Sequence, residues 1–384
     1  MKLTVPHDEL ASVAGWVTAM ARLSKLPPGA PPVLAGMLLT ADGDGTVTAA
    51  GFDGDASATA AVGGAEVGEP GKILIPARLL TEIARILPAG PVEIASDGTR
   101  ATLTARRTTY HLLLLPASYY PDLPADGELA AEFDAGDLAA AVGQVAGAAG
   151  TDETLRSLTC VQVVIGDGTA TLAATDRYRL AFAAVPCATG EADGTPLLIP
   201  AAHLAAITKQ ARGGPPVRVT AGPGGRGITA FAAGGRRVTT RLYEDEFPAL
   251  AGLMPAASDY AATLTVGIAE FTAAINRAAL VAARDTPVRF AFGNGEVLME
   301  SGTGDEATCA EPVAATIDGG PPEAIAFNPA MLANILATVS STGADTARIA
   351  LISDRRPAVI TASNPPGDWP VTATHALMPI RLAG

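Results

Sequence analysis

The chain has 384 residues, 48% of them apolar, which is enough to bury sizeable cores and excludes global disorder. No apolar stretch reaches the roughly 18 residues that a helix needs to cross a bilayer, which excludes membrane-spanning helices. The 39 acidic and 26 basic residues leave a net charge of −13, which excludes binding of nucleic acid by bulk attraction. Nucleic acid remains a possible partner only where basic residues gather on one surface and the contact is not tight.

The N-terminal segment predicts a cytoplasmic protein, because Met1–Pro6 breaks at a proline, turns acidic and lacks the long apolar core of a secretory signal. Cys160, Cys187 and Cys309 are far apart and odd in number, which argues against a disulfide framework or a thiolate zinc site and fits a reducing compartment. The four histidines are equally scattered. We therefore expect neither a metal nor a cofactor.

A short strand followed by an amphipathic helix is predicted three times along the chain. The strands begin at Leu3, Glu132 and Leu264. The apolar residues at helical spacing are Leu10, Val13, Val17 and Met20 in the first helix, Leu138, Val142 and Val145 in the second, and Phe271, Ile275 and Ala278 in the third. The equivalent positions 10, 138 and 271 are about 130 residues apart, which indicates an internal repeat.

A second element, a buried strand that leads through a proline into a helix, recurs over 72–80, 196–204 and 324–332. Its recurring leucines are again about 126 residues apart, and they are Leu79, Leu204 and Leu332. A third marker, a proline after an aromatic residue, recurs as Pro121 and Pro248. All three markers share a period of roughly 128 residues, and three such periods fill the chain.

Between the helices lie alternating runs such as Thr99–Thr104 and Val217–Thr220, which predict antiparallel strands and hairpins. We predict an α+β protein with one repeated fold, in which each domain packs two helices on antiparallel sheet. The predicted domains are residues 1–126, 127–256 and 257–384.

Motifs for catalysis or cofactor binding give no signal above background. Gly222–Gly227 matches G-x-G-x-x-G, but a strand-like run follows where a helix N-terminus is needed, so we predict a hairpin turn. Asp42–Thr46 begins like a calcium loop but lacks the later ligand and the glycine, which also predicts a turn. The scattered carboxylates are more typical of solvated surface than of acid/base pairs. We expect no enzymatic activity.

Basic residues recur on exposed faces and at the ends of predicted helices in all three domains. Singly, such residues are typical of a solvated helix face, or of a helix C-terminus where the dipole favours positive charge. Their recurrence instead favours one shared surface that faces a polyanion. The candidate residues are Arg22, Lys25, Arg78, Arg85, Lys209, Gln210, Arg212, Arg277 and Arg284.

Two segments carry a resemblance to a known family. Ala174–Ala181 reads A-T-D-x-x-R-L-A, and Met378–Leu382 reads M-P-x-R-L within an apolar C-terminal run that predicts either a final edge strand or the wall of a groove. With Tyr120–Pro124 and Glu246–Pro248, these segments resemble the bacterial β sliding clamp, the processivity subunit of the replicative DNA polymerase. Asp152–Leu155 is similar to the actinobacterial type. The resemblance covers the whole length, including the triplication.

The resemblance implies a non-catalytic ring. Two chains would pair head to tail, and six similar domains would enclose duplex DNA, with the basic residues on the helices facing it. Contacts to phosphate would be salt-sensitive and independent of sequence, and ring closure rather than affinity would retain the protein. By family position, Tyr110 and Leu112 of one chain would meet Leu280 and Val281 of the other.

The resemblance also implies an apolar groove between domains two and three, which docks short motifs of the replicative polymerase, the clamp loader and other partners. Its expected residues are Leu158, Thr175, Arg177, Tyr178, Arg179, Leu180, Pro248, Leu253, Asn328, Met331, Pro357, Met378, Pro379, Ile380, Arg381 and Leu382.

The chain departs from the family pattern in and near this groove. Ala249–Met254 carries no basic residue, and Met331 occupies a place where some relatives have tyrosine. Pro27–Pro32 lacks a basic residue that is common there. Two further hypotheses therefore stand beside the main one: a second clamp copy whose altered groove tolerates a clamp-directed inhibitor, and a peptide-binding scaffold that does not encircle DNA.

Overall fold

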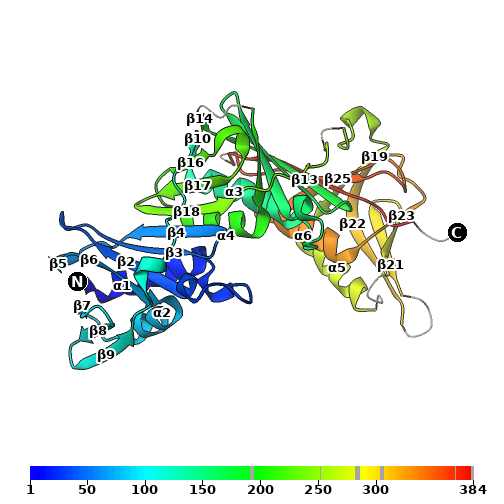
Figure 1. The fold of residues 1–384 in the computed structure, drawn as a ribbon. Coiled ribbons are helices and arrows are strands. Elements are labelled where there is room, and N and C mark those ends of the chain that lie inside the picture. Colours follow the sequence, from blue (N-terminus) through cyan, green and yellow to red (C-terminus); the bar gives the residue numbers. More distant parts are fainter. Residues whose placement is uncertain (191–193, 251, 282–285, 303–306, 368, 382–384) are drawn as a thin grey trace. The chain divides into compact units, whose positions relative to one another are not determined.

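The structure is a computed structural model that describes residues 1–190, 194–250, 252–281, 286–302, 307–367 and 369–381 (Figure 1). The chain divides into two compact units. Unit 1 comprises residues 1–135, 190–192 and 209–242, and unit 2 comprises 136–189, 193–208 and 243–384. Each unit is described by itself. No helix in these described ranges is long and apolar enough to cross a membrane.

The first repeat begins with a strand that runs directly into a helix, as the sequence predicts. Its helices are α1 (His7–Met20) and α2 (Ala77–Ile86). Its strands are β1 (Lys2–Pro6), β2 (Gly36–Ala41), β3 (Val47–Phe52), β4 (Ala56–Ala61), β5 (Glu66–Glu69), β6 (Gly71–Pro76), β7 (Pro91–Ser96), β8 (Arg100–Ala105) and β9 (Thr108–Leu113).

The second repeat follows the same order of elements. Its helices are α3 (Ala135–Val145) and α4 (Ala201–Ala211). Its strands are β10 (Glu128–Phe133), β11 (Cys160–Gly166), β12 (Thr169–Thr175), β13 (Arg179–Pro186), β14 (Ala188–Thr189), β15 (Pro196–Pro200), β16 (Val217–Ala221), β17 (Ile228–Ala233) and β18 (Arg236–Arg241).

The third repeat joins two strands of the pattern into one long strand, β22. Its helices are α5 (Ile268–Leu280) and α6 (Pro329–Ser340). Its strands are β19 (Ala262–Gly267), β20 (Val288–Phe292), β21 (Glu296–Ser301), β22 (Cys309–Gly319), β23 (Ala324–Phe327), β24 (Thr346–Leu351), β25 (Ala358–Ala362) and β26 (Thr372–Leu377).

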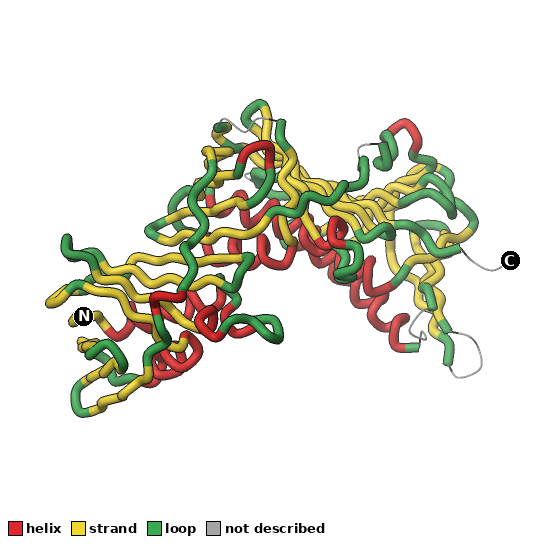
Figure 2. Tube along the Cα trace, in the orientation of Figure 1, coloured by secondary structure: helices red, strands yellow, loops and turns green. Residues whose placement is uncertain are grey.

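Unit 1 contains antiparallel sheets with helices against them. One sheet has the order β5-β1-β7-β8-β9, and another contains the run β10-β16-β17-β18-β4-β3-β2-β6. Helix α1 packs against β2, β3 and β4 and alongside α2 (Figure 2). Its buried side chains include Leu10, Val13, Val17 and Met20, so the predicted apolar face is confirmed.

Unit 2 contains one twelve-stranded antiparallel sheet with the order β15-β11-β12-β13-β26-β25-β24-β19-β22-β21-β20-β23. The buried core between α5, α6 and these strands is centred on Phe290. Its ring lies 5.6 Å from that of Phe271 and 5.7 Å from that of Phe327, measured between centroids. Phe271, Ile275 and Ala278 are buried, as predicted for the third helix.

Neighbouring repeats share sheets through equivalent strands. In unit 1 the last strand of the second repeat, β18, pairs with β4, so that Val238 lies opposite Ala58. In unit 2 the last strand of the third repeat, β26, pairs with β13, so that His375 lies opposite Ala181. The same pairing, between the last strand of one repeat and an inner strand of the preceding repeat, therefore joins the first repeat to the second and the second to the third.

Two expectations from the sequence are wrong in detail. Leu79 is 42% exposed, and Leu80 is the buried residue that corresponds to Leu204 and Leu332, because each of these three is the fourth residue of its helix. The C-terminal strand β26 lies between β13 and β25 and is not an edge strand. The turns predicted at 42–46 and 222–227 are confirmed, since each connects two paired strands.

Candidate functional site

A tight turn between β12 and β13 forms one wall of the candidate groove in unit 2. The Asp176 carboxylate accepts hydrogen bonds from the backbone N–H groups of Tyr178 (3.0 Å) and Arg179 (2.9 Å). The Thr175 hydroxyl accepts from the Arg177 N–H at 3.1 Å and donates to the Arg179 carbonyl at 2.7 Å. These bonds hold Arg177 in the left-handed region with φ 81° and direct the Tyr178 side chain outward.

An apolar floor lies beside this turn. Ala173, Leu180, Leu250 and Ala376 form one buried cluster, against which Phe247 and Met254 also pack. The segment after Tyr243 therefore covers the strands β12, β13 and β26 with its aromatic and aliphatic side chains. Burial of each such side chain stabilises the fold by roughly 1.5–3 kcal/mol.

Large apolar side chains remain on the surface around this floor. Tyr178 and Leu253 are more than half exposed, and Met378 is also exposed. The Met378 N–H donates to the Tyr178 carbonyl at 2.8 Å, which holds the end of β26 beside the turn. Exposed apolar groups next to a preformed floor are typical of a site that docks a partner side chain.

Helix α6 contributes residues from its first turn. The Asn328 side chain caps the helix by accepting from the Met331 N–H at 3.1 Å, and Pro329 takes the first helical position. Beyond β26, the Ile380 N–H donates to the Ala326 carbonyl at 2.8 Å. A pocket of about 110 Å³ lies there, lined by β23 together with Asp354, Arg355, Ile380 and Arg381.

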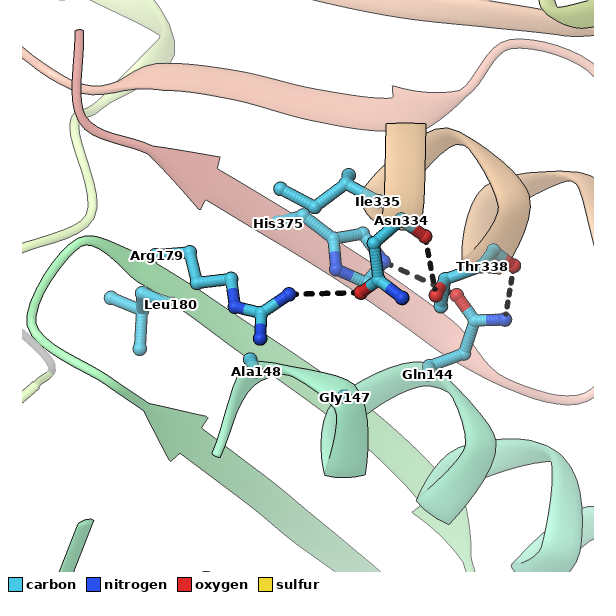
Figure 3. A pocket seen from close by; sticks show the side chains of 9 residues that line it. All are labelled: Gln144, Gly147, Ala148, Arg179, Leu180, Asn334, Ile335, Thr338 and His375. Carbon is cyan, nitrogen blue, oxygen red and sulfur yellow. Dashed lines mark hydrogen bonds between the residues drawn. The ribbon is translucent and has the colours of Figure 1, made fainter. Parts of the chain in front are cut away.

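A polar network connects the turn to α6 (Figure 3). Arg179 donates from Nε to Asp176 at 2.8 Å and from Nη1 to Oδ1 of Asn334 at 2.9 Å. Nearby, Gln144 donates from Nε2 to the Thr338 carbonyl at 3.0 Å and contacts Nε2 of His375 through Oε1 at 3.2 Å. Burial lowers the pKa of His375 to about 4.

The structure brings together many of the residues expected for the groove. Thr175, Arg177, Tyr178, Arg179 and Leu180 share the turn and the first part of β13. Leu158 is buried, and its carbonyl accepts a hydrogen bond from the Gly150 N–H at 2.8 Å.

The remaining expected residues enter from other segments. Pro357 precedes β25 and lies next to Met378 through the pairing of Ala358 with Leu377. Pro248 and Leu253 flank Leu250 in the covering segment, and Pro379 and Arg381 flank Ile380. Leu382 lies outside the described residues.

Three residues of this region were missed from the sequence. Asp176 is detectable in principle, because an aspartate at the start of a turn is typical of an Asx turn. Leu250 lies within a recognised repeat marker but its burial depends on distant strands. Asn334 carries no local signal, since its partner Arg179 is 155 residues away.

Several of the basic residues proposed to face a polyanion are paired with carboxylates. Arg22 binds Asp53 at 2.6 Å, and Arg78 binds Glu82 at 2.9 Å. Arg277 forms a bidentate pair with Glu311 on β22. The remaining cations make no ion pair within the described ranges and are exposed, namely Lys25, Arg85, Lys209 and Arg212. Gln210 is also exposed, and Arg284 lies outside the described residues.

The residues expected at the subunit interface lie in contrasting environments. Leu280 is 84% exposed at the end of α5, and Val281 follows it. Tyr110 lies on β9. Leu112 is only 5% exposed and belongs to the core of its own domain, whereas the adjacent Leu113 is 69% exposed. Leu113 is thus the exposed leucine of β9, because side chains on a strand alternate between its two faces.

Among the strand edges without a partner in the described part of the chain are those of β9 and of the first half of β22. β9 is the last strand of its sheet and pairs only with β8. Residues 309–314 of β22 pair only with β21 on one side, since the pairing with β19 begins at Ala315. Unpaired edges of this kind are templates for another strand.

Comparison with protein-family models matches three successive segments. Residues 1–124 match the N-terminal domain of the DNA polymerase III beta subunit, residues 132–249 its central domain, and residues 253–381 its C-terminal domain.

Curated relatives match the chain over all or most of its length. The chain is 37% identical to the beta sliding clamp of Streptomyces coelicolor, with both chains covered in full. It is 38% identical to the beta sliding clamp of Micrococcus luteus, which covers 83% of this chain and all of the relative. It is 31% identical to the beta sliding clamp homolog GriR of Streptomyces muensis, with both chains covered in full.

Solved structures show the same fold over the full length. The DNA polymerase sliding clamp of Bacillus subtilis gives a TM-score of 0.88 at 24% identity. The sliding clamp of Pseudomonas aeruginosa bound to griselimycin gives 0.87 at 21% identity. Each comparison covers all of both chains.

Proposed function

The chain belongs to the DNA polymerase III beta subunit family of non-catalytic sliding clamps, and we propose that it encircles duplex DNA as a head-to-tail homodimer and tethers the replicative polymerase. Further proposed partners are the clamp loader and other proteins with a clamp-binding motif, and the proposed location is the cytoplasm. The proposed domains are residues 1–126, 127–256 and 257–384. The observation that carries the dimer is the repeated pairing of strands between the clamp domains.

The pairing rule predicts how two chains join. Within each unit, the last strand of one repeat pairs with an inner strand of the preceding repeat, as β18 does with β4 and β26 with β13. The equivalent pair that remains is β9 of the first repeat and β22 of the third. One edge belongs to the first repeat and the other to the third, so a head-to-tail dimer would pair both edges in each subunit.

The register of this contact follows from the hairpins. Tyr110 corresponds to Val238 and His375, since all three lie opposite equivalent residues of the preceding strand, Leu103, Phe231 and Ile360. Cys309 corresponds in the same way to Ala58 and Ala181. These three residues lie opposite equivalent residues of the preceding strand, which are Ser301, Gly51 and Ala174 respectively. Because Val238 faces Ala58 and His375 faces Ala181, Tyr110 is predicted to face Cys309 of the partner subunit.

Exposed apolar side chains support the same contact. Leu113 lies on β9, Leu280 ends α5 beside the region of β22, and Ile86 ends α2 with most of its side chain exposed. A partner subunit that pairs with these edges would cover such groups, and burial of apolar side chains is the main favourable term in association.

A single substitution tests the register. The variant Tyr110→Cys places a thiol opposite the native Cys309, at the Cβ separation of directly opposed residues in antiparallel strands. Oxidation should then produce a covalent dimer on a non-reducing gel, reversed by dithiothreitol. Thr109→Cys is the matched control, because its side chain lies on the other face of β9. Equal crosslinking of both variants, or a wild-type protein that is monomeric at micromolar concentration by light scattering, contradicts the proposed dimer.

Topological retention on DNA tests the ring. The clamp is loaded by its loader on a nicked circular plasmid, and the DNA is then cut once with a restriction enzyme. Release after cutting is expected, because a ring slides off a free end. Retention on the linear DNA would support instead a scaffold that binds without encircling.

The groove around Leu180 and Leu250 is proposed to dock the apolar residues of partner motifs. Its polar turn and the exposed Tyr178, Leu253 and Met378 support this proposal. The paired variant Met378→Ala and Leu253→Ala should weaken binding of a polymerase-derived peptide and leave the dimer intact. Unchanged affinity would refute the assignment of the groove.

A specialised clamp copy that tolerates an inhibitor is the second candidate. It is favoured by the covering segment Ala249–Met254, which carries no basic residue, and by Met331 on α6. The solved clamp of Pseudomonas aeruginosa that shares this fold is bound to griselimycin. Titration of this protein with griselimycin distinguishes the two candidates, since tight binding contradicts tolerance.

A further inference from the structure

The groove turn and helix α6 are joined by a short polar chain of three side chains. Asp176 organises the turn and binds Arg179, and Arg179 reaches across to Asn334. The side chains of Asp176 and Arg179 are only 14% and 17% exposed. Arg179 therefore lies largely beneath the surface that a docking peptide would contact.

The two ends of this polar chain of side chains lie next to different parts of the groove, the apolar floor and the α6 wall. Arg179 is followed by Leu180, which belongs to the apolar floor. Asn334 lies one helical turn after Met331, whose N–H is bonded to the capping Asn328. A change in the distance between Arg179 and Asn334 would move the floor relative to the α6 wall.

We propose that Asp176, Arg179 and Asn334 form a strut that sets the width of the docking groove, and that Arg179 and Asn334 are positioning residues rather than contacts of the peptide. This proposal rests on the docking function proposed above. The guanidinium is suited to the task, because its planar fork makes directional bonds to both partners and stays charged at every physiological pH.

Asn334 is exposed, and one backbone segment approaches its amide closely. A Cβ atom placed on Gly147 would lie 3.3 Å from Oδ1 of Asn334, so the chain after α3 approaches this amide with no side chain between them. The same face of α6 receives two bonds from Gln144, to the Thr338 carbonyl and to the Ser341 hydroxyl. Figure 3 shows Asn334 between Arg179 and this second contact.

Substitution of Asn334 tests the strut, because this side chain is not part of the proposed peptide surface. Asn334→Ala removes the acceptor for Arg179, whereas Asn334→Asp keeps an acceptor in the same place. The probe is a fluorescein-labelled decapeptide with two leucines and a phenylalanine at its centre, measured by anisotropy. Asn334→Ala should weaken its binding about threefold to tenfold, as expected when the competent groove is populated a third to a tenth of the time. Asn334→Asp should restore binding to within about twofold of the wild type, because its carboxylate offers Arg179 an equivalent acceptor.

Ser341→Ala is the matched control, since it removes a hydrogen bond from the same face of α6 without touching the turn. Its peptide affinity should equal that of the wild type. An equal loss in Ser341→Ala and Asn334→Ala would show a general loosening of α6 and overturn the strut.

Hydrogen exchange separates failure of the strut from failure of the docking function. The N–H groups of Tyr178 and Arg179 should exchange faster in Asn334→Ala than in the wild type, with or without peptide. If the wild type fails to bind the peptide but this acceleration is seen, the docking proposal fails and the strut stands. If exchange in the turn is unchanged, the strut is wrong whatever the peptide does.

Discussion

Arg177 adopts a backbone conformation that is unfavourable for a residue with a Cβ atom. Its φ of 81° lies in the left-handed region, where the Cβ atom approaches the following carbonyl at a cost of about 1–2 kcal/mol. The bonds from Thr175 and Asp176 to the turn hold this conformation in place. Strained residues of this kind gather at ligand sites, where the surrounding structure determines their geometry.

Replacement of Arg177 by glycine should raise the thermal midpoint, since glycine adopts positive φ without the steric cost. The gain should be below about 1 kcal/mol, because glycine also loses more conformational entropy on folding. Arg177→Ala is the control, as it removes the same side chain and keeps the Cβ atom. Calorimetry that shows equal stabilisation by both variants would assign the effect to the side chain and not to the backbone.

His375 makes the stability of unit 2 depend on pH. Burial lowers its pKa from 6.5 to about 4, so the folded state keeps the imidazole neutral while the unfolded state takes up a proton as the pH falls below 6.5. Stability contributed by the neutral ring is therefore complete above pH 6.5 and is lost progressively toward pH 4. The loss at pH 4 is on the order of 3 kcal/mol.

The variant His375→Gln should remove this dependence while it keeps a polar partner for Gln144. Urea unfolding at pH 7.5 and at pH 5 measures the pH dependence of the unfolding free energy. The wild type should lose more of this free energy than the variant when the pH falls from 7.5 to 5. Identical pH profiles would show that another group titrates.

At the scale of elements, α6 begins with a side-chain N-terminal cap. The Asn328 side chain accepts from Met331, whereas α1 and α2 start at prolines that make no such side-chain bond. The cap lies in the groove wall, so it couples helix stability to the site.

Removal of this cap by Asn328→Ala should cost about 1 kcal/mol of unfolding free energy and speed hydrogen exchange in the first turn of α6. Asn328→Asp keeps an acceptor and should stay within a few tenths of a kcal/mol of the wild type. Chemical denaturation monitored by tryptophan fluorescence provides the measurement. A loss of equal size in both variants would contradict a capping role.

At the scale of the whole molecule, a protein of net charge −13 is proposed to encircle DNA while it makes only weak contacts with it. Internal pairing reduces the positive charge of the helix faces, because Arg22, Arg78 and Arg277 each bind a carboxylate. Weak contacts to phosphate suit sliding, while ring closure supplies retention.

Release of one of these cations should strengthen contact with DNA. Glu82→Gln frees Arg78 from its exposed ion pair and should raise the affinity for a 40-base-pair duplex a few-fold at low salt, with a slightly steeper dependence on salt concentration. Glu66→Gln makes the same change of net charge on β5 and is the control. Equal effects of the two variants would mean that Arg78 does not face the DNA.

The sequence by itself determined the three repeats, their α+β character and the buried faces of α1, α3 and α5. The repeats follow from self-similarity at a period of roughly 128 residues. The buried faces depend on local periodicity, which a stretch of some 15 residues carries without reference to the rest of the chain. The turn at Thr175–Arg179 and the Met378 segment were also recognisable, because short motifs carry them.

Only the tertiary structure decided which of two adjacent residues is buried, as with Leu79 and Leu80 or Leu112 and Leu113. It also decided that β26 lies inside a sheet, that Arg277 is tied to Glu311 and that Arg179 reaches Asn334. The physical reason is common to these cases. A strand's neighbours and a side chain's partners come from segments far apart in the chain, and a shift of one residue in pairing reverses which face is buried.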